Sequence, residues 1–132
     1  MKRLSEYIKE SIFDIEDNWN IDKHIKDEIQ EFLKANYKIR QYSISERPND
    51  GGKYVVDSKE SVYVKNKRMI HLTNDIFMWG EVKGNFVCSY GKSLTSLVGA
   101  PEKVGEDFDC RWCNSLASLV GAPKEVGGKF TC

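Results

Sequence analysis

Apolar residues in the first part of the chain recur at the spacing of two amphipathic helices. The first predicted helix covers about residues 3 to 17, with its apolar face on Leu4, Ile8, Ile12 and Ile15. The second covers about residues 21 to 36, with its face on Ile21, Ile25, Ile29, Phe32 and Leu33. Intervals of three and four residues place such side chains on one side of a helix. Because short helices are marginal alone, we expect both to pack on the rest of the chain.

The pattern changes to that of strands after the second helix. Ile39, Tyr42 and Ile44 are β-forming residues, and the stretch 54–56 is a run of tyrosine and valines. Between them, residues 47–52 read RPNDGG, which is a strong turn signal. We therefore predict a β-hairpin over about residues 38 to 57. The two helices and this hairpin, residues 1–57, would cap one end of the unit formed by residues 58–132.

The last fifty residues repeat with a period of 22. The matched positions are Phe86, Phe108 and Phe130; Cys88, Cys110 and Cys132; Leu94 and Leu116; Leu97 and Leu119; and Gly99 and Gly121, each followed by Ala-Pro. A period of this length with L-x-x-L spacing is typical of a leucine-rich-repeat solenoid. In a solenoid each coil buries its apolar side against the next coil.

The residues of one coil can be aligned with the positions of the leucine-rich-repeat pattern. Phe108 and Cys110 are two residues apart and point to the same side of a short strand. Cys113 falls where a small polar side chain bonds the turn backbone. Val62 precedes Phe86 by 24 residues, which predicts a diverged first coil over 61–83. The predicted fold is α+β: a short leucine-rich-repeat-like β-solenoid of about two to three coils, capped by two N-terminal helices and a β-hairpin.

The stretch GNFVCSYGKSLTSLVGAP, residues 84–101, resembles a known family. It is similar to the units of the leucine-rich-repeat-like proteins of large tailed bacteriophages, approximately GGxFxCSxCxSLTSLxGAPxxV. The resemblance covers residues 82–132 closely and 53–81 loosely. It implies the solenoid fold and a phage protein that acts in the cytoplasm of an infected host bacterium. A small, neutral phage protein that binds a host protein would fit an inhibitor of a host defence or regulatory system, so we expect an unidentified host protein as the partner.

The outward side of the strands is the usual binding surface of a solenoid. Tyr90 and Trp112 occupy the same position in successive coils, just after the strand. They either stack on each other and shield the core, or they form an anchor strip, since Trp, Tyr and Arg are enriched in binding hot spots. We expect the contact surface to comprise Val87, Ser89, Tyr90, Asp109, Arg111 and Trp112.

Cys110 and Cys113 form a C-x-x-C motif, which elsewhere serves as a redox pair or as half of a zinc site. A redox motif normally opens a helix, whereas the repeat puts this one at the end of a strand, where thiols act as small apolar filler. We therefore expect neither a metal nor a cofactor. Strands in adjacent coils lie ~4.8 Å apart, so ladder thiols could still reach disulfide or metal distance. A metal, if any bound, would take Cys88, Cys110, Cys113 and Cys132.

Composition argues against several classes of protein. Lys and Arg total 20, and so do Asp and Glu, without a basic stripe, which disfavours nucleic acid as a partner. No apolar run approaches the ~18 residues needed to cross a membrane. The first residues, MKRLSE, lack the apolar core of a signal peptide, so we expect a cytoplasmic protein with reduced thiols. His24 and His71 lie far apart without an oriented partner, and we expect no enzymatic activity.

The function expected from the sequence is therefore non-catalytic protein binding. The alternatives are a cysteine-based metal or redox module and a structural or assembly component of a virion. Phe130 and Cys132 fall on an open edge strand, and such edges readily pair with another chain. We expect a second copy to cover this edge across a two-fold axis, giving a homodimer.

Overall fold

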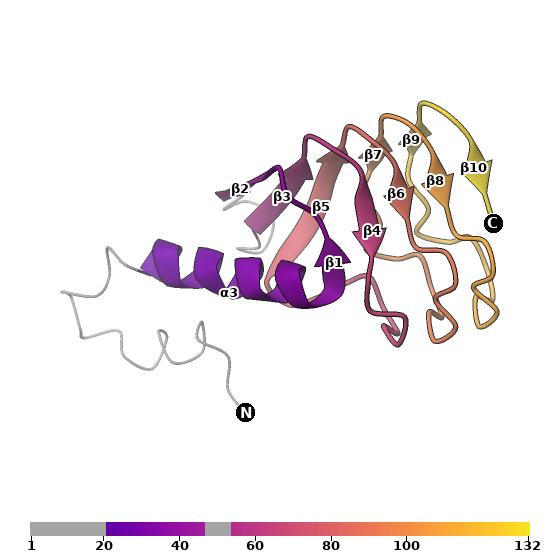
Figure 1. Ribbon diagram of the computed structural model, residues 1–132, viewed down its shortest axis with the longest axis horizontal. Helices are drawn as coiled ribbons and strands as arrows, with labels where there is room; N and C mark the ends of the chain where they lie inside the picture. The colour runs from indigo at the N-terminus through magenta and orange to yellow at the C-terminus, as the bar shows by residue number, and fades with distance from the viewer. Residues whose placement is uncertain (1–20, 47–53) are drawn as a thin grey trace.

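The computed structural model describes residues 21–46 and 54–132. These residues form one helix followed by ten short strands (Figure 1). The helix α3 spans Ile21–Asn36, as the sequence predicts. The strands are β1 Tyr37–Lys38, β2 Tyr42–Glu46, β3 Tyr54–Ser58, β4 Val62–Val64, β5 Phe77–Val82, β6 Phe86–Val87, β7 Lys103–Val104, β8 Phe108–Asp109, β9 Glu125–Val126 and β10 Phe130–Thr131. The helix predicted over residues 3–17 lies outside the described residues.

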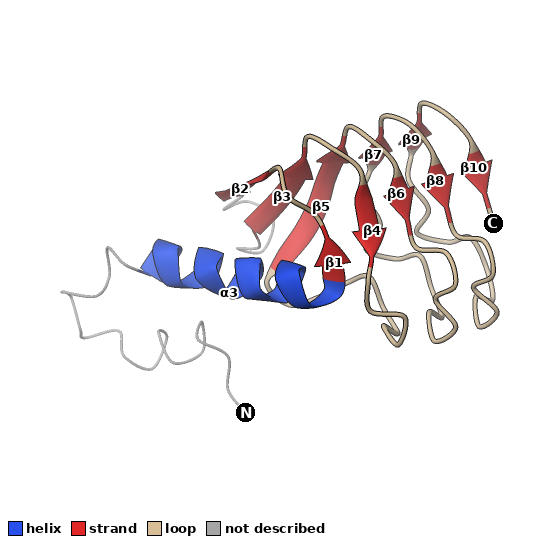
Figure 2. Ribbon diagram, viewed as in Figure 1, coloured by secondary structure: helices blue, strands red, loops and turns tan. Residues whose placement is uncertain are grey.

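The strands form two five-stranded sheets, which appear as two rows of arrows in Figure 2. The first sheet has the order β1-β4-β6-β8-β10, and the second has the order β2-β3-β5-β7-β9. In the first sheet Val62, Phe86, Phe108 and Phe130 lie side by side in parallel register. The diverged first coil is therefore confirmed. The protein is a β-solenoid of about four turns with 22-residue coils.

The number of turns differs from the prediction of about two to three coils, and the sequence predicted only the hairpin of the second sheet. Val82, Val104 and Val126 pair in parallel register and build the second row of strands. An additional turn begins at β3, because Tyr54 pairs in parallel with Phe77. This turn could not be recognised in the sequence, because Tyr54 and Phe77 are 23 residues apart and the turn shares none of the phenylalanine and cysteine positions of the repeat.

Antiparallel strands and the helix close the first end of the solenoid. β2 pairs with β3, which confirms the hairpin, and β1 pairs with β4. Helix α3 lies across this end of the molecule, far from β9 and β10 (Figure 1). Its Ile29 and Leu33 are fully buried, and Phe32 packs edge-on against Phe77 with ring centroids 5.7 Å apart. The cap thus supplies the apolar contacts that an outermost coil otherwise lacks.

The core of the coils is a column of stacked phenylalanines. The ring centroids of Phe86 and Phe108 are 5.6 Å apart, and those of Phe108 and Phe130 are 5.3 Å apart. At the corner beside this column, side chains extend the backbone ladder from coil to coil. The Asp107 N–H donates to Asn85 Oδ1 at 2.8 Å, and the Lys129 N–H donates to Asp107 Oδ1 at 2.7 Å. One apolar column and one polar column therefore keep successive coils in register.

Among the described residues, α3 included, no helix has both the length and the apolarity needed to span a membrane.

Candidate functional site

Each of the four parallel strands of the first sheet, β4, β6, β8 and β10, turns one side chain away from the core. These side chains belong to Tyr63, Val87, Asp109 and Thr131, which lie in parallel register. The residues on either side of each point inward, because successive side chains of a strand alternate between its two faces. Tyr63 is exposed and begins this row. Tyr63 is not among the residues that the sequence led us to expect in the contact surface, although its place between Val62 and Val64 was a usable signal.

Tyr90 and Trp112 extend the row at the turns that follow β6 and β8. Their rings are stacked, with centroids 6.3 Å apart and an interplanar angle of 18°. The Tyr90 N–H donates to the Arg111 carbonyl at 2.9 Å, which locks one turn on the next. The predicted stacking is confirmed. Nevertheless, Tyr90 is 57% exposed and Trp112 is 62% exposed, so both rings remain available for a contact.

Both aromatic residues adopt a backbone conformation that bulky residues rarely take. Their φ angles are +62° each, in the left-handed region. For a residue with a side chain this conformation costs roughly 1–2 kcal/mol, and glycine or asparagine tolerates it far better. Such strained positions cluster at functional sites. Two successive coils thus carry an exposed aromatic ring where the backbone alone favours a small residue.

Arg111 is held in place beside Trp112 by an ion pair. Its Nε and Nη2 donate to the two carboxylate oxygens of Asp109 at 3.1 and 2.9 Å, and its backbone N–H also donates to Asp109 Oδ1. The hydrogen bonds from Arg111 keep the pKa of Asp109 below its ordinary value. The Arg111 side chain is more than half exposed. The fork-like pairing therefore orients a cation without removing it from the surface.

Five of the six residues expected to make the contact surface reach the surface together. Tyr90, Arg111 and Trp112 are exposed, while Val87 and Asp109 are half-buried. Ser89 differs, since it is only 9% exposed. The strand alternation ends at Cys88, where the chain begins its turn. We call the surface set the outer strip; it consists of Tyr63, Val87, Tyr90, Asp109, Arg111 and Trp112.

The cysteines contact one another between coils. Cys88 and Cys110 are buried in the core, which confirms their packing role. The sulfur atoms of Cys110 and Cys132 touch, and the Cα atoms of these residues are 4.5 Å apart. The Cys113 thiol donates to the Cys88 carbonyl at 3.1 Å, which confirms the turn-bonding role of Cys113. The structure pairs Cys110 with Cys132 and leaves Cys88 and Cys113 unpaired with other cysteines.

No group of three or more potential metal ligands comes together in the part of the chain that the structure describes.

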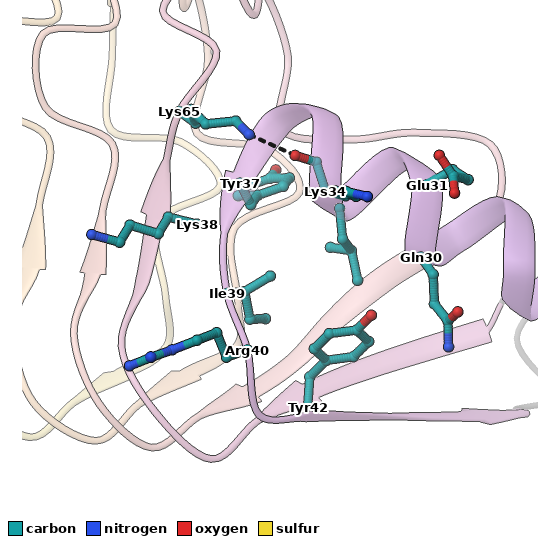
Figure 3. Close-up of a pocket in the computed structure, with 10 residues that line it drawn as sticks. Gln30, Glu31, Lys34, Tyr37, Lys38, Ile39, Arg40, Tyr42 and Lys65 are labelled. Carbon is teal, nitrogen blue, oxygen red and sulfur yellow. Dashed lines mark hydrogen bonds between the residues drawn. The ribbon is translucent and has the colours of Figure 1, made fainter.

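A groove of about 530 Å³ lies between the end of α3 and the segment that follows it (Figure 3). Four cations line it, namely Lys34, Lys38, Arg40 and Lys65. The Lys65 ammonium already donates to the Lys34 carbonyl at 2.7 Å and caps the helix end. Lys38 and Arg40 extend away from the helix in Figure 3. The cations thus do not converge as an anion site requires.

The far end of the solenoid presents an apolar surface. Leu119, Val120 and Phe130 are exposed there, as is Cys132, so the open edge predicted at Phe130 and Cys132 is accessible. Strand β10 pairs with β8 on one side, and none of the described strands pairs with its other side. A cavity of about 460 Å³ opens between this end and Trp112. We call Leu119, Val120, Phe130 and Cys132 the end face.

The fold places the protein in the class of β-solenoids. Compared with known proteins, the chain matches no family model, no curated protein and no solved structure.

Proposed function

We propose that this protein is a non-catalytic binding module that contacts another protein through the outer strip. The observation that supports this most is the Tyr90–Trp112 stack, which combines high exposure with a strained backbone. An aromatic pair beside an oriented arginine has the composition of a binding hot spot. Packing alone does not explain the two aromatic residues, because glycine or asparagine adopts a positive φ at an exposed turn position at lower energetic cost.

The partner is proposed from the repeats. Their similarity to leucine-rich-repeat-like phage proteins favours a phage protein in the host cytoplasm and a bacterial protein as its target. Inhibition of a defence or regulatory protein would require only tight binding and no catalytic step. The outer strip is partly apolar and carries one exposed guanidinium, so the complementary surface would hold apolar side chains and a carboxylate.

Replacing both aromatic residues by asparagine tests this function. In the double variant Tyr90→Asn/Trp112→Asn, the left-handed backbone is retained at lower cost, so folding should be preserved. The loss of two hot-spot side chains should weaken binding about 30-fold or more. The measurement is a comparative pull-down from bacterial lysate, followed by titration calorimetry on the protein that the wild type retains.

A matched control uses Ile70 and Val98, which are also exposed apolar residues and lie outside both the outer strip and the end face. The variant Ile70→Asn/Val98→Asn should bind as the wild type does. If the two double variants retain the same proteins with the same affinity, the outer strip is not the binding surface.

We also propose that the end face joins two copies of this chain across a two-fold axis. The support is the exposed Phe130 together with the unpaired side of β10, since an open edge strand readily accepts another strand. Sedimentation velocity of the 132-residue chain should show a dimer whose fraction rises with concentration. Phe130→Lys should remain monomeric, because a charge on the edge blocks strand addition. A wild-type chain that stays monomeric at high concentration would contradict the proposal.

A further inference from the structure

We propose that Cys88 and Cys113 form a peroxide-reactive thiol pair that closes to a disulfide between two neighbouring coils. This inference is independent of the binding function proposed above. The reacting pair, Cys88 and Cys113, comes from two different coils and differs from the C-x-x-C pair of Cys110 and Cys113.

The geometry of the pair carries the inference. Cys88 follows β6 and is almost completely buried, whereas Cys113 lies in the turn after β8 and is half-buried. The Cys113 Sγ atom is 3.1 Å from the Cys88 carbonyl oxygen, which places the Cys113 thiol directly against Cys88. The two side chains are therefore neighbours although they stand 25 residues apart. One sulfur faces outward, and the other lies behind it.

Access to Cys113 comes from the cavity of about 460 Å³ beside the end face. Cys113, Trp112, Leu116 and Leu119 are among its lining residues. Hydrogen peroxide is small and uncharged, so this opening admits it. Cys88 does not line the cavity, which leaves Cys113 as the first thiol of the pair that an oxidant meets.

Hydrogen bonds and one nearby cation favour a thiolate on Cys113. The hydrogen bond from Cys88 is the largest influence and, with the Gly91 backbone N–H and the Lys67 ammonium, lowers the pKa of Cys113 to about 7; burial and Asp109 act in the opposite direction. Lys67 is fixed near the pair, since its ammonium donates to the Val64 and Ser89 carbonyls at 2.9 Å each. The same hydrogen bond, followed by burial, raises the pKa of Cys88. At neutral pH the outer sulfur is thus the nucleophile, and the inner one keeps its proton.

The reaction then has two steps. The Cys113 thiolate attacks one peroxide oxygen, the O–O bond breaks, and the products are the Cys113 sulfenic acid and hydroxide, which takes up a proton to become water. The Cys88 sulfur attacks the Cys113 sulfur, the S–O bond breaks, and the Cys88 proton leaves with the hydroxyl group as a second water. Overall, two thiols lose two electrons to one peroxide molecule, giving one disulfide and two waters.

Cys110 is a poor alternative partner for Cys113. Its sulfur is buried and already touches that of Cys132 in the next coil. A link from Cys110 to Cys113 would require Cys110 to leave this contact and the core. The two contacts between coils instead divide the four cysteines into two separate pairs, Cys88 with Cys113 and Cys110 with Cys132.

Tryptic mapping of the wild-type protein distinguishes these pairings. Arg111 separates Cys110 from Cys113, so the four cysteines fall on four different peptides, namely 84–92, 104–111, 112–124 and 130–132. After one equivalent of hydrogen peroxide and quenching with an alkylating reagent, we expect peptide 84–92 to be joined to 112–124. A link between 104–111 and 112–124 would overturn the proposal. So would Cys113 sulfinic acid without any link to 84–92.

Variants test the order of the two steps. In Cys88→Ser the resolving thiol is absent, so dimedone should trap a sulfenic acid on Cys113 that the wild type does not accumulate. Cys132→Ser is the matched control, because it changes an exposed cysteine of the other pair, and it should form the 84–92 to 112–124 link as the wild type does. The rate of Cys113 alkylation should rise with pH to half its maximum near pH 7, because the thiolate is the reactive form. Equal dimedone labelling of Cys88→Ser and wild type would count against Cys88 as the resolving thiol.

Discussion

Replacing Phe108 by alanine should lower the free energy of unfolding by about 3–5 kcal/mol, which is the range for deleting a fully buried phenylalanine. Phe108 has no exposed surface and lies between Phe86 and Phe130 in the stacked column, with centroids 5.6 and 5.3 Å away. The substitution leaves a cavity at the centre of the column. The coils on both sides are hydrogen-bonded to this one, so they cannot collapse into the space.

Phe130 provides the matched control, because it has the same side chain at the same position of the next coil but is 40% exposed. Phe130→Ala should cost less than half as much as Phe108→Ala, since less apolar surface returns to water. Urea unfolding followed by circular dichroism, at a protein concentration where the chain is monomeric, measures both values, with the slope of the transition checking that unfolding remains cooperative. Equal losses for the two variants would show that the column does not carry the stability of the coils.

Gly99→Ala should destabilise the protein by about 3 kcal/mol, from the left-handed backbone and from overpacking together. Gly99 has a φ of +98°, where a side chain is strained. A Cβ atom there would lie 2.5 Å from the Thr73 backbone nitrogen and 2.8 Å from the Leu72 carbonyl carbon of the preceding coil. The obstacle is backbone and cannot rotate away, so the two coils must separate at this corner.

The control for this substitution is Gly91→Ala. A Cβ atom on Gly91 has its nearest contact with the Cys88 carbonyl oxygen at 3.2 Å, and Gly91 does not have a positive φ. We expect this variant to lose less than ~1 kcal/mol. Thermal unfolding of the three proteins side by side measures the difference. If Gly99→Ala melts together with Gly91→Ala, close approach of the coils is not what requires glycine at position 99.

The repeat predicted the parts of the fold that depend on residue type at a fixed spacing. Phe86, Phe108 and Phe130 lie in register because identical apolar side chains are buried by stacking one coil on the next. The weaker spacing from Val62 to Phe86 was also enough to locate the preceding coil. The second sheet was predicted only at its β2–β3 hairpin. Each of its later strands is two residues long, and Lys103–Val104 carries no alternation that would distinguish a strand from a turn.

The candidate site was predicted less completely, for two physical reasons. The positive φ angles at Tyr90 and Trp112 could not be predicted from the sequence, because bulky residues rarely adopt this conformation. The pairing of the cysteines depends on side chains meeting between coils, whereas the C-x-x-C spacing draws attention to Cys110 and Cys113 within one coil. The signal for the observed contact was the position of Cys113 in the turn, where its thiol bonds the Cys88 backbone.

The polar column at the corner of the coils makes the molecule extensible. The Asn85 side-chain oxygen accepts a backbone hydrogen bond from the next coil, and the Asp107 side-chain oxygen accepts the equivalent bond from the coil after that. The two sides of a coil that face its neighbouring coils are therefore chemically complementary, so one coil can stack on another of the same kind. Duplicating residues 104–125 would add a coil without creating a new kind of junction, and would lengthen the outer strip by another Asp-x-Arg-Trp step. The length of the surface is thus a variable that gene duplication can change one unit at a time.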